Sequence, residues 1–280
     1  MDYAKEFKVE SNSKVDLDKV DANYKGEDDK DSSQATIAKY VQRLLALQYL
    51  MYAENKRSLL IILQGMDAAG KDGLINHVIS AMNPQGCRVF GFKAPSVREQ
   101  AHDYLWRIHY AAPRKGFVTI FNRSHYEDVL VVRVHNLVPK EVWGRRYEEI
   151  NAFERLLANS GTHILKFYLH IDKDEQLARF KQRLDDPTRH WKISESDYKE
   201  REYWNDYQKA FEDAISKCST NYAPWYIIPS NRKWFRNLAV SQILVETLES
   251  LNMKFPAPTV DIAEIKKKYH AALKQEKKNS

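Results

Sequence analysis

The sequence predicts an α/β fold in which a mostly parallel five-stranded sheet lies between two layers of helices. Short apolar runs alternate along the chain with segments whose apolar residues recur at helical spacing. This alternation is typical of a parallel sheet that is covered on both faces. In addition, a chain of 280 residues with 43% hydrophobic residues can bury the core of one large domain or of two small ones.

Five apolar runs are predicted to be strands, and seven further segments are predicted to be helices. The strands are residues 58–64, 87–92, 116–121, 163–171 and 225–228. The helices are residues 34–54, 74–82, 99–110, 142–158, 174–184, 198–215 and 238–251. Turn-forming residues separate several of them, such as the NPQG stretch at residues 83–86 and Pro187.

The chain is expected to divide into three parts. Residues 1–55 form an N-terminal arm and helix, and the polar stretch 14–33 is expected to lie on the surface or to be partly disordered. Residues 56–258 form the core, which includes a helical lid at about residues 173–200. Residues 259–280 form a basic tail, helical in its first half, which is either a solvated surface helix or an anion-binding segment.

Composition limits the setting and the partners of the protein. The two cysteines, Cys87 and Cys218, suggest neither a disulfide framework nor a metal site, so a reducing, cytoplasmic compartment is expected. No apolar run is long enough to span a bilayer, and the N-terminus lacks the apolar stretch of a signal peptide, so no membrane contact is expected. The net charge of +6 fits a polyanionic partner, such as nucleic acid, a nucleotide, inorganic polyphosphate or an acidic protein.

The first predicted strand leads into the sequence GMDAAGKDG, which has the spacing of a phosphate-binding loop. In this phosphate loop (residues 65–73), backbone N–H groups and the N-terminus of the following helix would face phosphate oxygens, and Lys71 would bridge the terminal phosphates. The residues expected to contact phosphate or nucleotide are Gly65, Met66, Ala68, Ala69, Gly70, Lys71, Asp72 and Gly73. The alternative is a tight strand-to-helix turn with a surface lysine.

Two aspartates make this loop unusual, because a Ser or Thr that holds Mg²⁺ usually follows the lysine. Asp72 takes that place, where it either caps the helix or contacts the metal. Asp67 lies within the loop and would repel the bound anion by about 4 kcal/mol at a separation of about 4 Å near a protein surface. Asp67 is therefore predicted to hold Mg²⁺ or to accept a proton from an attacking phosphate, so that donor and acceptor are both phosphates.

A second group of polar residues follows the third predicted strand, at the edge of the sheet where ligands bind in such folds. Asn122 stands where an acid that holds Mg²⁺ through water is usual, and Arg123 offers a bidentate fork to phosphate. Glu127 and Asp128 are expected to supply the missing negative charge. The alternative is an ordinary loop followed by an acidic first helical turn.

A third group lies within the sequence RFKQRLDDPTRHWKISESD. It is predicted to be a basic helix, a proline-marked break and a second helix that starts at Ser194, with Asp197 as its capping partner. Mobile lids of this kind supply cations that close over phosphates in phosphoryl-transfer enzymes. The basic residues are Arg179, Lys181, Arg183, Arg189, His190 and Lys192. The alternative is a solvated basic face.

With these residues, the chain resembles the polyphosphate kinase 2 family. The matching segments are GMDAAGKDG (65–73), NPQGCRVFGFKAPS (83–96), FNRSHYEDVLVVRVH (121–135) and RFKQRLDDPTRHWKIS (179–194). The resemblance implies a three-layer α/β/α P-loop kinase fold of the thymidylate-kinase type with a helical lid. It also implies Mg²⁺-dependent phosphoryl transfer between polyphosphate and nucleotides, with Mn²⁺ as a substitute metal. The implied partners are polyphosphate and adenine or guanine nucleotides rather than nucleic acid or a membrane, and the implied assembly is a homodimer or homotetramer.

The resemblance also assigns roles by position. It makes Asp67 the loop carboxylate, Lys71 the loop lysine and Arg183 a lid arginine that faces phosphate, and it places Arg123 after the second acidic-motif position. Together with the charge argument above, the expected catalytic residues are Asp67, Lys71, Arg123 and Arg183, and the expected metal ligands are Asp67, Glu127 and Asp128. Lys93, Asn122, Arg133, Arg179 and Lys192 join the phosphate loop as phosphate- or nucleotide-binding residues.

Asn122 indicates a subgroup within the family. Members that favour nucleoside diphosphates tend to read GRDAAGKGG and FDRSWY, whereas this chain reads GMDAAGKDG and FNRSHYED. The chain is similar to the subgroup that accepts both AMP and ADP, with Glu127 helping to replace the charge lost at Asn122. GDP is a further candidate acceptor.

Two other functions remain open at the level of sequence. A P-loop kinase that uses ATP to phosphorylate another nucleotide or a small molecule would act without polyphosphate. A non-catalytic polyanion-binding protein would bind without turnover, but it would have no use for Asp67.

Overall fold

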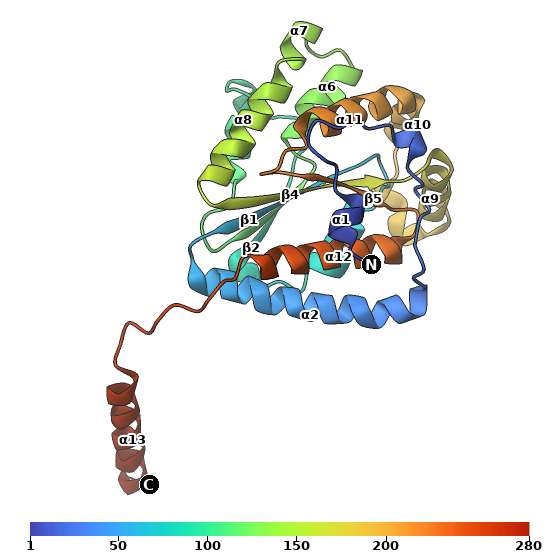
Figure 1. The fold of residues 1–280 in the computed structure, drawn as a ribbon. Helices are drawn as coiled ribbons and strands as arrows, with labels where there is room; N and C mark the ends of the chain where they lie inside the picture. Colours follow the sequence, from blue (N-terminus) through green and yellow to red (C-terminus); the bar gives the residue numbers. More distant parts are fainter. Residues whose placement is uncertain (280) are drawn as a thin grey trace.

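The computed structural model describes residues 1–279, which contain a five-stranded sheet in the order β2-β3-β1-β4-β5 (Figure 1). The strands are β1 (Ser58–Gln64), β2 (Cys87–Gly91), β3 (Val118–Asn122), β4 (Thr162–His170) and β5 (Trp225–Pro229). All neighbouring strands in this sheet run parallel. The predicted α/β class and the five strands are confirmed, and the sheet is wholly rather than mostly parallel.

β1 lies at the centre of the sheet and leads into the phosphate loop. All of its residues are buried, as expected for an apolar strand that is covered on both faces. The register aligns Leu63 of β1 with Asn122 of β3 and with Phe167 of β4. The carboxyl ends of β1 and β3 therefore lie side by side, which brings the phosphate loop next to the residues that follow β3.

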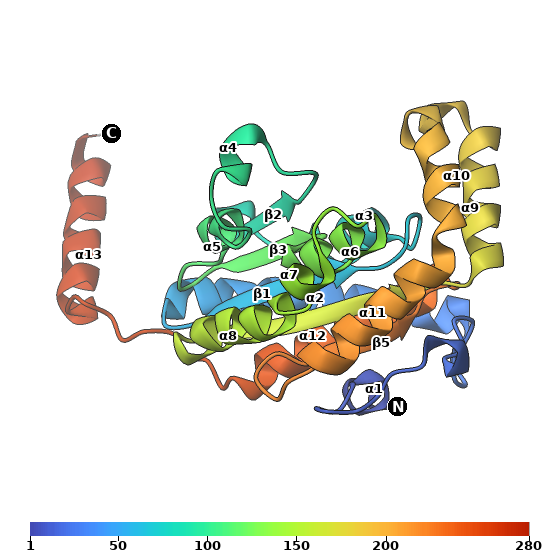
Figure 2. The ribbon, with the colours of Figure 1, turned by 90° about the horizontal axis from the view of Figure 1, so that it is seen from above.

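The helices form a layer on each face of the sheet (Figures 1 and 2). α2 (Lys30–Glu54) and α12 (Lys233–Ser250) pack together on one face, and α8 (Arg146–Asn159) and α11 (Trp204–Cys218) pack on the other. The other helices are α1 (Tyr3–Phe7), α3 (Lys71–Leu74), α4 (Val97–Gln100), α5 (Trp106–Ala111), α6 (Val131–Val134), α7 (Lys140–Trp143), α9 (Lys173–Asp185), α10 (Glu195–Glu202) and α13 (Ile262–Asn279). The predicted three layers are confirmed.

Four of the predicted helices are divided in the structure. The segments 74–82, 99–110, 142–158 and 198–215 correspond to α3 with a π-helical turn (Ile75–Ile79), α4 with α5, α7 with α8, and α10 with α11. Between α4 and α5, Oδ1 of Asp103 accepts a hydrogen bond from the backbone N–H of Leu105 at 3.0 Å, which stabilises a turn. At Tyr203 the chain leaves the lid for the core, although its helical periodicity continues.

The N-terminal arm (residues 1–29) packs on the core through a few buried side chains, whereas most of the stretch 14–33 lies on the surface, as one of the two expectations had it. Leu17 is 1% exposed. The rings of Tyr3, Phe7 and Tyr24 surround Phe235 of α12 at centroid distances of 5.5 to 5.9 Å. The few apolar residues of the arm follow neither a helical nor a strand period, so periodicity alone could not show that they are buried.

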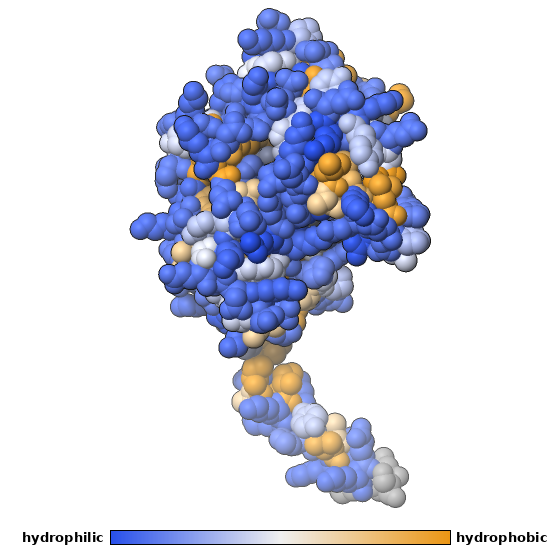
Figure 3. Space-filling view, turned by 90° about the vertical axis from the view of Figure 1, so that its right-hand side faces the viewer, coloured by the Kyte–Doolittle hydropathy of each residue, from blue (hydrophilic) through white to orange (hydrophobic). Residues whose placement is uncertain are grey.

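α13 lies away from the body of the molecule at the end of an extended segment (Figures 1 and 3). The helix runs to Asn279 rather than ending in the first half of the tail, and Ser280 lies outside the described residues. Ile262, Ile265 and Tyr269 are exposed along it. Within residues 1–279, no helix combines the length and the apolar character that a membrane-spanning segment requires.

Candidate active site

The phosphate loop connects β1 to α3 through sharply turned backbone. Gly65, Ala68 and Gly70 have positive φ angles of 151°, 63° and 104°. The φ angle of Gly70 strains any residue with a side chain, and a Cβ there would also displace Nη1 of Arg236. The loop therefore presents its backbone closely at the start of α3, as phosphate binding requires.

Lys71 lies back over the loop and is 9% exposed. Its Nζ donates hydrogen bonds to the carbonyl oxygens of Gly65 at 2.8 Å and Met66 at 3.2 Å. Burial, followed by the positive charge of Arg123, lowers the pKa of Lys71 to about 8, although the carboxylate of Asp67 acts in the opposite direction. The ammonium group is thus held over the loop, where a bound phosphate would meet it.

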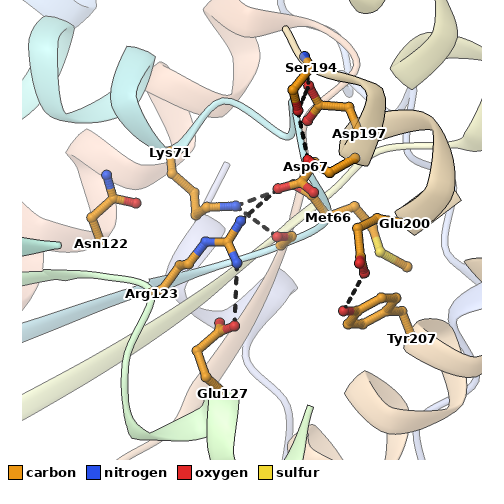
Figure 4. Close-up of polar contacts among 12 residues, drawn as sticks. Met66, Asp67, Lys71, Asn122, Arg123, Glu127, Ser194, Asp197, Glu200 and Tyr207 are labelled. Carbon is orange, nitrogen blue, oxygen red and sulfur yellow. Dashed lines mark hydrogen bonds and ion pairs between the residues drawn. The ribbon is translucent and has the colours of Figure 1, made fainter. Parts of the chain in front are cut away.

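Arg123 joins the phosphate loop to the residues that follow β3 (Figure 4). Its Nη2 donates to Oδ1 of Asp67 at 2.7 Å, and its Nη1 donates to Oε2 of Glu127 at 3.4 Å. The φ angle of Arg123 is 63°, a left-handed conformation that is uncommon outside glycine and often marks a functional site. Asp67, Arg123 and Glu127, which the sequence offered in two separate groups, form one cluster.

Asp72 links the phosphate loop to β3 and to the lid. Its carboxylate accepts a hydrogen bond from Nδ2 of Asn122 at 2.8 Å. Its other oxygen lies 3.7 Å from Nζ of Lys192. Asn122 therefore contacts the loop through Asp72, at the position where an acidic residue was expected from the fold.

The lid consists of α9, the 3₁₀ helix Pro187–Lys192 and α10, which stand together at one end of the sheet (Figure 2). The predicted capping pair of Ser194 and Asp197 is present at the start of α10. Nη1 of Arg183 donates to the carbonyl oxygen of Lys192 at 2.8 Å, which connects the two sides of the lid. The predicted helix, break and second helix are therefore confirmed.

The phosphate loop and the lid border a cavity of about 660 Å³, called the larger cavity below. Two carboxylates that line it are Asp67 and Asp72. Its basic lining residues are Lys71, Lys93, Arg123, Arg179, Arg183, Arg189, Lys192, Lys233 and Arg236. This cavity unites most of the predicted phosphate-binding residues, and its excess of positive charge suits a polyanion. Lys233 and Arg236 were not predicted, because they lie between the predicted strand 225–228 and the predicted helix 238–251, whereas α12 begins at Lys233.

A second cavity of about 320 Å³, the smaller cavity below, shares Asp67 and Arg123 with the larger one. The other acidic residues that line it are Glu127, Asp197 and Glu200, and its apolar and aromatic residues are Met66, Leu130, Val131, Trp204, Tyr207 and Phe211. The hydroxyl of Tyr207 donates to Oε2 of Glu200 at 2.7 Å (Figure 4). The sequence analysis missed this cavity, for which the one signal was the concentration of aromatic residues in segment 198–215.

The model of the polyphosphate kinase 2 (PPK2) family matches residues 27–256. The chain belongs to the polyphosphate kinase 2 family. It is 51% identical over 256 residues to the AMP/ADP-polyphosphate phosphotransferase of Meiothermus ruber, a match that covers 91% of this chain and 96% of that protein. It is 45% identical over 271 residues to the ADP-polyphosphate phosphotransferase of Rhodopseudomonas palustris, with 91% and 93% covered. The crystal structure of polyphosphate kinase 2 from Arthrobacter aurescens TC1 matches with a TM-score of 0.93 at 41% identity, and the match covers 97% of each chain.

Membership of the PPK2 family confirms the resemblance that the sequence motifs indicated. It confirms the kinase class of the enzyme, and the match to a solved PPK2 structure confirms the fold. It also decides against a non-catalytic polyanion-binding protein.

Three residues of this PPK2 enzyme that were expected to bind ligands lie outside both cavities. Ala69 of the phosphate loop is fully buried, and the other two are charged residues. Arg133 pairs with Asp213 at 2.6 Å and lies over the ring of Trp143 at 4.7 Å. Asp128 pairs with Arg146 at 3.0 Å, and burial raises its pKa to about 6 in spite of that cation. Both side chains point into the layer of helices, where they make structural contacts.

Arg179 lines the larger cavity, but its guanidinium is bonded to protein groups on every side. Nε donates to Glu175 at 2.7 Å, and Nη1 donates to the carbonyl oxygens of Ala68 at 2.8 Å and Ala69 at 3.0 Å. Nη2 donates to two carbonyl oxygens that follow β5, at 2.5 and 3.1 Å. These contacts hold the phosphate loop against α9, so we assign Arg179 a positioning role in place of the predicted phosphate contact.

The predicted metal ligands were tested against the geometry of the site. Within residues 1–279, no three His, Cys, Asp or Glu side chains form a group that could hold a metal ion by themselves. Asp67 and Glu127 nevertheless contact the same guanidinium and line the same cavity. Mg²⁺ at phosphoryl-transfer sites is usually held by one or two carboxylates together with substrate phosphates. These two residues fit such an ion, whereas Asp128 is engaged by Arg146.

Proposed function

We propose that this PPK2 enzyme reversibly transfers a phosphoryl group between inorganic polyphosphate and AMP or ADP, with GDP as a further candidate acceptor. The observation that carries the proposal is that two cavities of different character meet at the Asp67–Arg123 ion pair. The names of its relatives from Meiothermus ruber and Rhodopseudomonas palustris support the choice of substrates.

The larger cavity suits polyphosphate because its positive charge is spread over several parts of the chain. Lys71 belongs to the phosphate loop, Lys93 follows β2, Arg183 belongs to the lid and Lys233 begins α12. A linear polyanion carries charge on each of its phosphate units and therefore needs cations along its length rather than at one point. We assign the donor chain to this cavity.

The smaller cavity suits a nucleoside because it combines aromatic surface with hydrogen-bond acceptors. Trp204, Tyr207 and Phe211 supply flat apolar surface for a base, and Glu200 supplies oxygens for hydroxyl or amino groups. Its volume of about 320 Å³ falls within the range of small-molecule sites. We assign the nucleoside to this cavity, with its terminal phosphate beside Asp67 and Arg123.

In the proposed reaction, an oxygen of the terminal nucleotide phosphate attacks the terminal phosphorus of polyphosphate in line with the bond that breaks. The new P–O bond forms as the bond to the next phosphate breaks, and that phosphate keeps the bridging oxygen and its electron pair. Lys71, Arg123 and Arg183 neutralise the charge on the transferred group. Asp67 orients the attacking phosphate and is placed to accept its proton. Catalysis is thus mainly positioning and charge neutralisation.

We include Mg²⁺ in this proposal, held by Asp67 and Glu127, with Mn²⁺ able to take its place. When bound, the ion would neutralise negative charge on the reacting phosphates. A cation at this point accounts for Asp67, because a carboxylate in a phosphate loop would otherwise repel the ligand. Removal of divalent ions with EDTA should abolish transfer, and added Mg²⁺ should restore it.

The test is product formation by purified protein with Mg²⁺ and long-chain polyphosphate, supplied separately with AMP, ADP or GDP. ATP formed from ADP, and ADP followed by ATP formed from AMP, would support both the reaction and the dual-acceptor subgroup. ATP formed from ADP with AMP inert would keep the reaction and refute our interpretation of Asn122. Consumption of ATP on another acceptor, without any transfer from polyphosphate, would favour the ATP-dependent kinase instead.

The oligomeric state and the cellular compartment of the enzyme remain predictions. One is assembly into a homodimer or homotetramer, which light scattering of the purified protein would measure. The other is the reducing cytoplasmic compartment, which fits the two free cysteines within residues 1–279 and which cell fractionation would test.

A further inference from the structure

A buried arginine without a counter-ion borders the larger cavity. Arg236 of α12 is 2% exposed. The acceptor of its hydrogen bonds is Oδ1 of Asn237, at 3.1 Å from Nε and 2.8 Å from Nη2. Among residues 1–279, no carboxylate lies within ion-pair distance of its guanidinium. Nη1 has no acceptor in the described part of the chain and faces Gly70 of the phosphate loop.

Arg179 next to it shows how a buried arginine is normally satisfied. The guanidinium of Arg179 has an ion pair with Glu175 and four carbonyl acceptors. Arg236 is buried to the same degree, but one neutral amide oxygen replaces this whole set. Burial and the positive charge of Arg179 lower the pKa of Arg236 to about 9. A buried charge is costly unless it is paired, so this guanidinium calls for an anion.

The position of Arg236 indicates which part of a ligand would supply that anion. Nη1 faces Gly70, and a Cβ placed on Gly73 would lie 3.3 Å from Nη2, so the guanidinium lies along the start of α3. Asp67, which contacts Arg123 where the transfer is proposed, lies earlier in the loop than these two glycines. A phosphate chain whose last unit lies at Lys71 would therefore continue over Gly70 and Gly73 toward Arg236. Lys233, one helical turn earlier, lines the same cavity.

We propose that Arg236, assisted by Lys233, binds the phosphates of the donor from the third unit onward, where the transferred phosphate is the first unit. The inference rests on the proposed function, because it assumes that polyphosphate occupies the larger cavity. It adds that the chain runs from Lys71 toward the N-terminal turns of α12, and that recognition of a long donor depends on this end of the cavity. Arg236 thus favours donors that have three or more phosphate units.

The N-terminal arm holds this end of the cavity in place. The backbone N–H of Asn231 donates to the carbonyl oxygen of Ala22 at 3.1 Å, and Nε of Arg232 donates to that of Asn23 at 3.3 Å. Phe235, next to Arg236, is packed among the rings of the arm. The arginine is therefore held in place before the ligand arrives, which reduces the entropy that binding has to offset.

The experiment compares Arg236→Met, Arg236→Lys and a control, Arg155→Met, in the full-length protein. Arg155 is exposed on α8, on the opposite face of the sheet. Melting temperatures are measured without ligand, with pyrophosphate and with long-chain polyphosphate, and KM is measured for long-chain polyphosphate and for ADP. Pyrophosphate is the probe for the first two phosphate positions, and the long chain reports on the positions behind them.

We expect Arg236→Met to melt at the same temperature as the wild type or higher without ligand, because an unpaired buried charge has been removed. Its stabilisation by long-chain polyphosphate should fall, whereas stabilisation by pyrophosphate should not. KM for the long chain should rise about tenfold, which is the loss expected for a charge-assisted phosphate contact, and KM for ADP should stay within about twofold. Arg236→Lys should recover most of the loss, and Arg155→Met should match the wild type.

An Arg236→Met protein that melts earlier but keeps its KM for polyphosphate would overturn the inference and make Arg236 structural. If Arg236→Met does not fold, Lys233→Met gives the same comparison, and an unchanged KM for polyphosphate in that variant would count against the site. Absence of transfer from polyphosphate in the wild type would refute the proposed function itself. Transfer by the wild type with unchanged variants would refute this inference alone.

Discussion

The two cavities that meet at Asp67 and Arg123 differ in how they are lined. Lysines and arginines from the phosphate loop, the lid and α12 line the larger one. Carboxylates and aromatic rings from α10 and α11 line the smaller one. A repeating polyanion needs distributed charge, whereas a nucleoside needs shape and hydrogen bonds. The difference shows that substrate binding is divided between the two cavities, and that the residues common to both are the ones placed to act on the transferred group.

This division has a measurable consequence. A substitution that affects one cavity alone should change KM for one substrate and leave KM for the other nearly unchanged. A substitution at the shared ion pair should lower kcat, because it changes the interactions of the transferred phosphate itself. The variants below test the division, starting with the largest expected effect.

Asp67→Asn should lower kcat for ATP formation from ADP and polyphosphate by about a thousandfold, a loss typical of a missing electrostatic group in an active site. The amide keeps the size of the side chain but removes the charge that would hold Mg²⁺ and accept a proton. Arg123 keeps its contact with Glu127, so the fold should survive. Steady-state kinetics together with a melting curve measures both effects.

Asp174→Asn is the matched control for this prediction, because Asp174 is exposed on α9 and lines neither cavity. It should retain the activity of the wild type. A folded Asp67→Asn protein with full kcat would show that the shared ion pair has no part in the chemistry.

Arg183→Gln should raise KM for long-chain polyphosphate about tenfold and leave KM for ADP within about twofold. Arg183 lines the larger cavity from the lid and does not line the smaller one. The control is Lys181→Gln, since Lys181 lies on the same helix, pairs with Asp185 at 2.6 Å and faces neither cavity. Equal rises in both KM values for Arg183→Gln would mean that the lid serves the two substrates alike.

Val131→Phe should act in the opposite way and raise KM for ADP about fivefold, because the added ring occupies part of a cavity of about 320 Å³. KM for polyphosphate should not change, since Val131 does not line the larger cavity. Val132→Phe, on the same helix and outside both cavities, is the control. A rise in KM for polyphosphate rather than for ADP would mean that polyphosphate binds in the smaller cavity and the nucleotide in the larger one.

The sequence was a good guide to the parts of the site that local backbone geometry determines. The phosphate loop is recognisable because close approach of backbone to phosphate fixes the positions of Gly65, Gly70 and Lys71. The sequence also placed Asp67 and Arg123 at the carboxyl ends of strands in one parallel sheet, although it did not predict their contact. The structure adds that β1 and β3 are neighbours in that sheet.

The sequence was a poor guide to the direction in which a side chain points and to sites that form between segments far apart in the chain. Glu127 and Asp128 are adjacent in the 3₁₀ helix His125–Val129, so their side chains point about 120° apart. One reaches Arg123 and the other reaches Arg146 in the helix layer. The smaller cavity is lined by four separate stretches of the chain, within 65–67, 123–131, at 176 and within 196–211, and no local pattern joins them.

The smallest expected effect concerns pH, and it tests the larger cavity through Lys71. The pKa of Lys71 is about 8 in the free protein, against 10.5 for an ordinary lysine. As pH rises through 8, the free protein loses this cation, so affinity for polyphosphate should fall a few-fold from about pH 7 to about pH 9.5. The folded state binds this proton less tightly than the unfolded state, so this group should make the free protein more stable as pH rises from about 8 to 10.5.

Calorimetric titration of the protein with long-chain polyphosphate at each pH would measure the change in affinity. Lys71→Arg is the control, because arginine stays protonated throughout this range, and its affinity, although weaker overall, should vary less with pH. Affinity for ADP should stay level over the same range if the nucleotide is held in the smaller cavity. A wild-type affinity for polyphosphate that is level up to about pH 9.5 would mean that the other cations of the larger cavity hold the chain without Lys71.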